Sequence, residues 1–244
     1  MNLNTILFDL DGTLLPMDYD RFVKLYFGAL ANYGFKERGL DPKALSKAIW
    51  AGTEAMQSND GQATNRERFW ARFCLLMDDT DAETLEPVFE RFYETEFEAA
   101  RDAINASDAA QKSICLLRKK GYTLVLATNP VFPLIAVKKR LSWAGIPYTD
   151  FAHITTYDNS SYCKPNAAYF KDILACVGKS PENCLMVGND VGDDMGAKAA
   201  GLDVYLVTDC IINPQSLPTD GFRQGSMEAF YKYVRELPEV EKLR

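Results

Sequence analysis

From residue 107 to residue 207 the sequence alternates between short apolar runs and stretches of helical periodicity, and this alternation restricts the fold more than any other feature. The runs have the length of β-strands, and nearly continuous apolar strands are typical of parallel sheets covered on both faces. Together with a similar run near the N-terminus, the expected strands are residues 5–8, 122–127, 151–154, 184–187 and 204–207. Strands that alternate with helices favour right-handed crossovers, so we predict an α/β fold with a parallel sheet.

Residues 16–103 interrupt this pattern, because they show helical periodicity without a convincing strand. Apolar residues at spacings of three and four predict a first helix that ends at Gly34, and Asp41-Pro42 is typical of the start of a second. A third helix should carry Phe69 and Phe73. A fourth should follow a capping box at residues 80–83, with a break or kink near Pro87.

The charge of the chain excludes several classes of partner. Its formal net charge is −7, and residues 15–105 hold 11 Lys and Arg against 17 Asp and Glu. Nucleic acids and anionic membranes bind basic surfaces, so we expect neither as a partner. No run approaches the roughly 18 apolar residues of a membrane span, and the N-terminus has no signal-peptide pattern. We therefore expect a cytoplasmic protein.

The six cysteines show no CxxC pairing, and most of them lie within apolar segments. In a reducing compartment such residues are small buried hydrophobes more often than disulfides or metal ligands. We therefore predict that Cys74, Cys115, Cys163, Cys176, Cys184 and Cys210 are mostly buried and have no redox or metal-binding role.

Polar residues follow several of the expected strands at the point where each strand ends. They are Asp9 and Asp11 after the first strand, Thr128 and Asn129 after the second, Lys164 in the loop after the weakest, and Asp190, Asp193 and Asp194 after the next. The carboxyl ends of parallel strands meet at one edge of a sheet, so these residues can converge on one crevice. The repulsion between two neighbouring carboxylates can be offset by a bound cation, and carboxylate oxygens suit Mg²⁺. The set suits an anionic substrate held beside a divalent cation.

The order of these motifs resembles that of the haloacid dehalogenase superfamily. The chain has Asp-x-Asp-Gly-Thr at residues 9–13, a strand-end Thr at 128, Lys-Pro at 164–165 and an acidic loop at 190–194. The resemblance implies a Rossmann-like catalytic core of residues 1–15 and 104–244, with a C1-type helical cap of residues 16–103. It also implies the phosphatase branch, because dehalogenases of this superfamily generally lack the second Asp.

The resemblance assigns a role to each matching residue. Asp9 would attack phosphorus and form an aspartyl-phosphate, and Asp11 would protonate the leaving oxygen and then activate water. Thr128 and the backbone of Asn129 would hold phosphoryl oxygens, and Lys164 would pair with both Asp9 and the phosphoryl group.

The same resemblance implies a Mg²⁺ site made of Asp9, the backbone carbonyl of Asp11, Asp190 and, largely through water, Asp194. One departure leaves the register open, because Asn189 stands between Gly188 and Asp190 where the family commonly reads Gly-Asp. Asp190 with Asp194 keeps two carboxylates four residues apart and is preferred. Asn189 with Asp193 would replace a charged ligand with an amide.

The predicted function is Mg²⁺-dependent hydrolysis of a small phosphate monoester, with a phosphorylated metabolite as the partner. A phosphomutase of the β-phosphoglucomutase type and a non-catalytic regulatory protein with the same fold stay open as alternatives. Residues 16–103 are expected to move as a lid on two short connections, with Arg66 or Arg68 beside the leaving group. His153, the single histidine, is expected to be structural.

Overall fold

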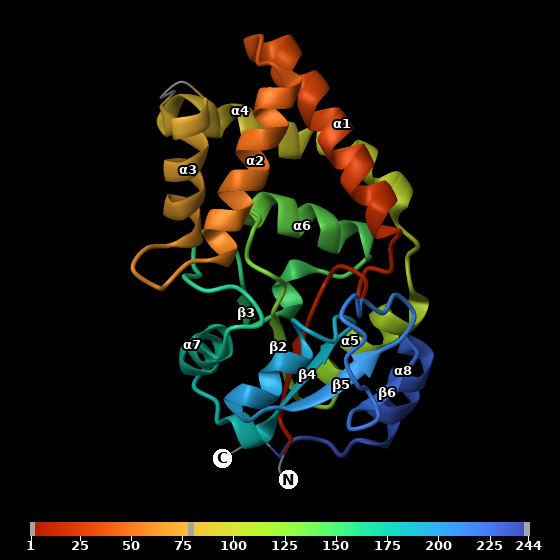
Figure 1. Cartoon of the computed structure of the whole chain (residues 1–244). Helices are drawn as coiled ribbons and strands as arrows, with labels where there is room; N and C mark the ends of the chain where they lie inside the picture. The colour runs from red at the N-terminus through yellow and green to blue at the C-terminus, as the bar shows by residue number, and fades with distance from the viewer. Residues whose placement is uncertain (1–2, 78–80, 242–244) are drawn as a thin grey trace.

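A six-stranded parallel sheet forms the centre of the computed structural model, which describes residues 3–77 and 81–241 (Figure 1). Its strands are β1 (Thr5–Phe8), β2 (Thr123–Leu126), β3 (His153–Ile154), β4 (Cys184–Gly188), β5 (Asp203–Val207) and β6 (Arg223–Gly225). The order across the sheet is β3-β2-β1-β4-β5-β6, so β1 lies between β2 and β4. The predicted α/β fold is confirmed. Sequence reasoning missed β6, since that short strand is largely exposed and has no apolar run.

The two faces of the sheet belong to two separate groups of buried residues. Ile6 and Phe8 of β1 pack on one face, against helices α5 (Asp108–Lys119) and α8 (Met227–Glu236). Leu7 packs on the other face, with α7 (Ala167–Val177) and the 3-10 helix η4 (Met195–Ala200). Alternate residues of a strand point to opposite faces, so a strand between two helical layers needs the continuous apolar sequence seen in β1.

The helical insert, residues 16–103, lies over the ends of the strands in Figure 1, with α6 (Leu134–Trp143) beneath it. It contains α1 (Tyr19–Arg38), α2 (Pro42–Gln57), α3 (Asn65–Leu76), α4 (Ala82–Glu94) and η1 (Glu96–Ala103). The core beneath it has two further 3-10 turns, η2 (Tyr148–Asp150) and η3 (Pro181–Asn183). Buried aromatic residues of the insert, such as Tyr26 and Phe97, belong to the same hydrophobic cluster as Phe8.

One expectation for the insert is wrong, and of the break or kink expected at Pro87 the break does not occur. Helix α1 does not end at Gly34 but continues to Arg38 and ends at Gly39, whose φ of 66° is left-handed. Position 34 favours glycine because of packing and not because a helix ends there. A Cβ at Gly34 would lie 2.8 Å from a methyl carbon of Leu45 in α2. Helix α4 runs through Pro87 without a break, since the burial of its apolar face outweighs one lost hydrogen bond. The predicted capping box begins at Thr80, outside the described residues, and Asp81 caps the helix.

The chain enters and leaves the insert at one place. Met17 and Ile104 form an antiparallel bridge, and the Asn105 N–H donates to the Pro16 carbonyl at 2.8 Å. The Asp18 N–H donates to the Ala103 carbonyl at 3.0 Å. The two connections therefore lie side by side, as a hinge requires.

A second attachment joins the start of α3 to the loop after β3. The N–H groups of Asn65 and Arg66 donate to the carbonyls of Ser160 and Tyr157, each at 2.8 Å. The Arg66 guanidinium pairs with Glu86 of α4, and the Tyr157 hydroxyl donates to the same carboxylate at 3.1 Å. Motion of the insert as a lid would have to break these bonds, so the expectation of two connections was incomplete.

Within the described residues, no helix is both long and apolar enough to cross a bilayer.

The expectation for the cysteines holds only in part. Cys163 and Cys184 are buried, whereas Cys115 and Cys176 are exposed on helices α5 and α7. Both exposed residues lie on the solvent side of helices whose other face packs on the sheet.

The Arg66–Glu86 pair should stabilise the protein in a pH-dependent manner. Hydrogen bonds from Arg66 lower the pKa of Glu86 below its ordinary value of 4.5. A lowered folded-state pKa stabilises the protein above pH 4.5, and this contribution is lost as the pH falls through the folded-state pKa. Replacing Glu86 with Gln should reduce the free energy of unfolding at pH 7 by about 1 kcal/mol, because Arg66 is partly exposed and screened by solvent.

Urea unfolding of the wild type and Glu86→Gln at several pH values measures this difference, which should shrink below pH 4.5. Asp60→Asn is the matched control, since the Asp60–Arg68 pair is exposed and lies within the insert. A difference that stays constant from pH 7 to pH 3 would contradict the assigned ionisation.

Candidate active site

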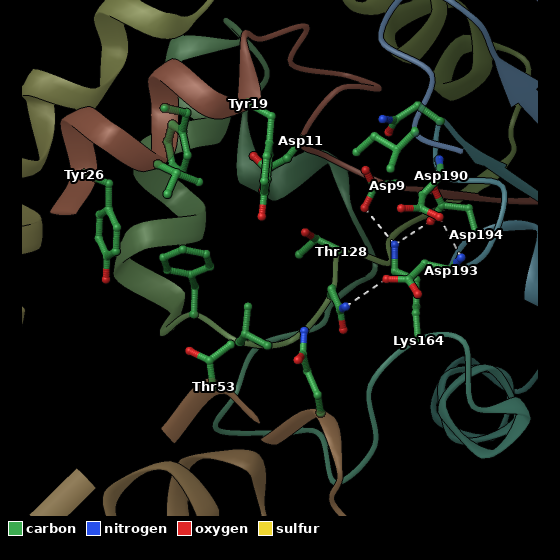
Figure 2. Close-up of a pocket in the computed structure, with 18 of the residues that line it drawn as sticks. Asp9, Asp11, Tyr19, Tyr26, Thr53, Thr128, Lys164, Asp190, Asp193 and Asp194 are labelled. Carbon is green, nitrogen blue, oxygen red and sulfur yellow. Dashed lines mark hydrogen bonds and ion pairs between the residues drawn. The ribbon is translucent and has the colours of Figure 1, made fainter. Parts of the chain in front are cut away.

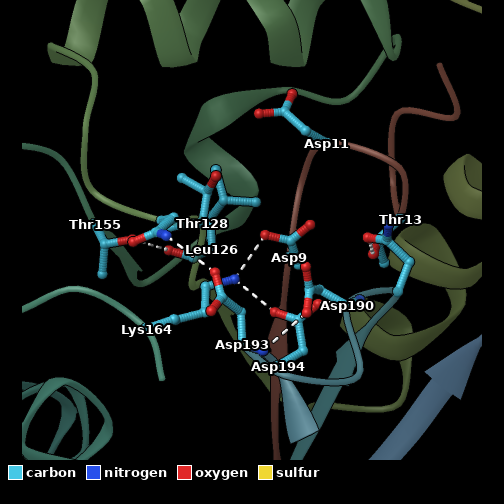
Figure 3. Close-up of polar contacts among 12 residues, drawn as sticks. Asp9, Asp11, Thr13, Leu126, Thr128, Thr155, Lys164, Asp190, Asp193 and Asp194 are labelled. Carbon is cyan, nitrogen blue, oxygen red and sulfur yellow. Dashed lines mark hydrogen bonds and ion pairs between the residues drawn. The ribbon is translucent and has the colours of Figure 1, made fainter. Parts of the chain in front are cut away.

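The carboxyl end of β1 delivers Asp9 to a buried group of charges (Figure 3). The Lys164 ammonium donates to Asp9 Oδ1 at 2.7 Å and to Asp194 Oδ1 at 2.6 Å. The Lys164 and Asp194 side chains are only 2% and 1% exposed, and that of Asp9 is 10% exposed. The structure therefore brings together three residues that are far apart in the sequence.

Burial and these contacts change the pKa values of the group. Burial raises the pKa of Asp9 to about 7, against the lowering effect of Lys164, and the nearby Asp194 and Asp11 raise it further. Burial alone would lower the pKa of Lys164, but Asp194 and Asp9 raise it well above its ordinary value. Lys164 is therefore a permanent cation, whereas the negative charge of Asp9 is only partly compensated.

The Asp11 side chain is directed away from Asp9, towards α6 (Figure 3). It forms an ion pair with Arg140, whose side chain is fully buried. The second carboxylate oxygen, Asp11 Oδ1, is buried and has no hydrogen-bond partner. Burial raises the pKa of Asp11, and Arg140 opposes this increase.

Sequence reasoning missed Arg140. A signal was present, because Arg140 falls on the apolar stripe of its helix, three residues after the buried Val137 and four before the buried Ala144. A charge at such a position is rarely buried without a partner. The sequence did not indicate that the partner is Asp11, 129 positions away.

Thr128 and Asn129 follow β2 and line the same cavity as Asp9. The Thr128 carbonyl accepts hydrogen bonds from the hydroxyls of Thr155 at 2.7 Å and Tyr169 at 2.9 Å, which fix this turn from behind. Asn129 Nδ2 donates to Asp193 Oδ2 at 3.2 Å. Thr155 and Tyr169 were also missed, because a positioning hydroxyl has no distinctive sequence pattern.

The acidic loop after β4 is ordered by its own side chains. Asp190 Oδ1 accepts the N–H groups of Gly192 at 2.8 Å and Asp193 at 2.9 Å, and Asp194 Oδ2 accepts the Asp190 N–H at 2.9 Å. Asp194 thus holds both Lys164 and the Asp190 backbone. Burial raises the pKa of Asp193 to about 6, and Lys164 opposes this increase.

Asn189 has both ends of its amide occupied. Its Oδ1 accepts from the Thr13 hydroxyl at 2.8 Å, and its Nδ2 donates to the Cys210 carbonyl at 2.7 Å. Gly12, with a φ of 86°, is packed against this amide, because a Cβ there would lie 2.4 Å from Asn189 Nδ2. The Asn189 amide is therefore committed to contacts within the protein, and the choice between the two metal-site registers stays a prediction.

A cavity of about 410 Å³ lies between the strand ends and the insert (Figure 2). Its acidic side is visible on the right of the figure and its aromatic side, with Tyr26, on the left. The catalytic candidates that line it are Asp9, Asp11, Thr128, Asn129, Lys164, Asp190 and Asp194. All the residues that the motifs predicted for the site therefore meet in one cavity.

The donor set fits a divalent cation in its chemistry. Five carboxylates and one ammonium line the cavity. Burial raises the pKa of Asp9, and the neighbouring carboxylates Asp194 and Asp11 raise it further against the effect of Lys164. In the part of the chain that the structure describes, no three His, Cys, Asp or Glu side chains already form a metal cage. Lys164 lies between Asp9 and Asp194 instead, so Asp194 contacts Lys164 and the Asp190 N–H with its two oxygens.

The structure corrects the expected basic contacts. Arg66 pairs with Glu86, Arg68 pairs with Asp60, and neither arginine lines the cavity. His153 lies in β3, where its Nδ1 is 3.4 Å from the Cys176 sulfur, outside the cavity.

Several curated proteins are similar to this chain over most of its length. Pyrophosphatase PpaX of Anoxybacillus flavithermus is 26% identical over 202 residues, which are 82% of this chain and 81% of that protein. Phosphoglycolate phosphatase of Aliivibrio fischeri is 26% identical over 209 residues, or 85% of each chain.

A solved structure is similar in fold to this chain, and a family model matches its sequence. The crystal structure of a HAD phosphatase from Thermococcus onnurineus has a TM-score of 0.60 and 18% identity, and the match covers 98% of this chain and 100% of that one. This likeness shows a shared fold. The sequence model of the haloacid dehalogenase-like hydrolases matches residues 3–201, so the resemblance found in the motifs is confirmed. The chain belongs to the haloacid dehalogenase-like hydrolases.

Proposed function

We propose that this hydrolase is a Mg²⁺-dependent phosphatase that acts on a small phosphate monoester through an aspartyl-phosphate. The observation that carries the proposal is the placement of Asp9 beside Lys164 in a cavity that Asp11, Thr128 and Asp190 also line. The relatives named as a pyrophosphatase and a phosphoglycolate phosphatase support this reaction class.

In the first step Asp9 Oδ2 attacks phosphorus, because Lys164 holds the other oxygen. The bond between phosphorus and the leaving oxygen breaks, and Asp11 donates a proton to that oxygen. Burial raises the pKa of Asp11 and favours its protonated form, whereas Arg140 opposes this increase, so the ion pair with Arg140 would have to open for Asp11 to reach the leaving oxygen. The Thr128 hydroxyl and the Asn129 backbone N–H hold the phosphoryl oxygens as charge develops.

In the second step a water molecule attacks the phosphorus of the aspartyl-phosphate and gives its proton to Asp11. The bond between Asp9 and phosphorus breaks, which restores the Asp9 carboxylate and releases inorganic phosphate. The Lys164 ammonium compensates charge on Asp9 and the phosphoryl group throughout. Asp194 keeps Lys164 in place through its short contact.

Asp9, the Asp11 carbonyl and Asp190 would hold Mg²⁺, with Asp194 supporting the Asp190 loop. When bound, the ion would neutralise phosphoryl charge and orient the phosphoryl group for attack. The occupied amide of Asn189 supports Asp190 as the charged ligand.

The helical insert would serve as the cap over this site, with residues 1–15 and 104–244 as the catalytic core. Tyr19, Trp50 and Thr53 of the insert line the cavity, which supports a role in excluding water. The attachment of α3 to the loop at residues 157–160 would hold the cap closed.

The nucleophile has a direct test. Asp9→Asn should fold normally and lose at least about a thousandfold in kcat with p-nitrophenyl phosphate, because an amide cannot attack phosphorus. Asp172→Asn on the exposed side of α7 is the matched control and should keep wild-type activity. Substantial turnover by Asp9→Asn would contradict the assignment.

The metal register has a second test. Activity should require Mg²⁺ and disappear with a chelator. Asp190→Asn keeps an acceptor for the Gly192 N–H but removes the charge, so the Mg²⁺ concentration for half-maximal activity should rise by roughly tenfold or more. Asn189→Ala should raise it less. The reverse ranking would show that Asn189 and Asp193 are the metal residues.

Arg140→Met should destabilise the protein by about 3 kcal/mol, because it removes the fully buried cation that pairs with the largely buried Asp11 carboxylate. The double variant with Asp11→Asn should lose less than the sum of the single losses, since the carboxylate is then absent. Urea unfolding of both single variants and the double variant measures this coupling. Lys138→Met on the same helix is the control, and purely additive losses would mean that the pair does not couple.

A further inference from the structure

The part of the cavity farthest from Lys164 has a different chemical character from the catalytic part. Val23 and Phe27 of α1, Trp50 of α2, and Val131 and Phe132 after β2 form an apolar wall. The aromatic end opposes the acidic end in Figure 2, where Thr53 is drawn far from Asp190.

Trp50 is 50% exposed although it is large and apolar. Its ring stacks on that of Phe27, with centroids 5.1 Å apart and an angle of 14° between the planes. Both rings line the cavity. A partly exposed aromatic pair on a cavity wall offers a flat surface to a ligand ring, which gains stacking and burial.

The cavity offers no available cation for a second negative group on the substrate. Among the described residues that line it, Lys164 is the single Lys or Arg, and it is already held by Asp9 and Asp194. The Arg140 guanidinium is buried behind the wall, 4.3 Å from the centre of the Phe132 ring. The carboxylates that line the cavity would also repel a second anion.

Few polar side chains remain at this end. Thr53 Oγ1 donates to the Ile49 carbonyl at 2.9 Å, and Gln57 is exposed at the end of α2. Both are uncharged and can form hydrogen bonds with a neutral substituent. The volume of about 410 Å³ lies within the range of small-molecule sites and has room for a ring beside the phosphoryl group.

We infer that the substrate is the phosphate monoester of an uncharged, aromatic alcohol or phenol, whose ring lies against Trp50 and Phe27. This inference rests on the proposed phosphatase function and narrows its substrate class. Monoesters whose leaving group carries a carboxylate or a further phosphate are poor substrates, because the anion would be desolvated beside an apolar wall without a cation.

Two esters that differ in one charge test the inference: 4-carbamoylphenyl phosphate and 4-carboxyphenyl phosphate, assayed with Mg²⁺. The wild-type kcat/KM should be at least about tenfold higher for the amide. Thr53→Lys adds a cation to the wall and should shift the ratio towards the carboxylate by about tenfold. Thr84→Lys, on the exposed side of α4, is the matched control and should leave the ratio unchanged. Because each variant is compared on the same two esters, intrinsic leaving-group reactivity cancels.

The aromatic wall is tested separately. Trp50→Ala should lower kcat/KM for 4-carbamoylphenyl phosphate by about tenfold relative to 2-hydroxyethyl phosphate, which has no ring. Phe35→Ala is the control, because Phe35 is also exposed, at 59% against 50% for Trp50, but lies outside the cavity.

The outcomes separate the two proposals. Turnover of both aryl esters with equal kcat/KM, and with no response to Thr53→Lys or Trp50→Ala, would overturn the substrate class and leave the phosphatase function standing. Absence of turnover for every phosphate ester, p-nitrophenyl phosphate included, would overturn the phosphatase function and this inference with it.

Discussion

The ion pairs of Lys164 with Asp9 and Asp194 are the interaction on which the site depends. An ammonium that is 2% exposed is strongly destabilising without partners, so both carboxylates must reach it. Asp9 directly follows β1, Asp194 lies in the loop after the neighbouring strand β4, and Lys164 comes from the loop after β3. Because β1 and β4 are neighbours in the sheet, the two carboxylates lie close enough to pair with the same ammonium. Asp194 also links this ion-pair cluster to the acidic loop, because its second oxygen accepts a hydrogen bond from the Asp190 N–H.

Much of the fold and the residues at the acidic end of the cavity could be predicted because their signals are local. Apolar runs such as residues 184–187 identify strands without knowledge of their neighbours, and a parallel sheet then sends every strand end to one edge. Asp9, Thr128 and Asp190 could be grouped on that ground alone. The strand β3 was recovered only in part, since two of the four expected residues pair with β2.

The remaining features could not be predicted, because they depend on partners that are distant in the sequence. Gly34 resembles a helix end and is instead the point where α2 approaches α1. Arg66 had the position expected of a substrate contact, but Glu86, 20 residues later, binds it. The burial of Arg140 also depends on a distant partner, because it is explained only by the ion pair with Asp11. Charge patterns along the chain identify charged residues and leave their partners undetermined.

The two ends of the cavity are built from different parts of the chain, and they therefore differ in how strongly a substitution there would disturb the fold. The acidic end consists of strand-end residues held by buried hydrogen bonds, so a change there would disturb Lys164 and the sheet edge together. Much of the apolar end consists of side chains of α1 and α2, among them Trp50, whose partial exposure means that few core contacts depend on it. Under the proposed function, substitutions at Trp50 or Thr53 would therefore alter the preferred leaving group at a small cost in stability. By the same argument, the ion pairs of Asp9 do not depend directly on the insert, because Lys164 and Asp194 both lie outside residues 16–103.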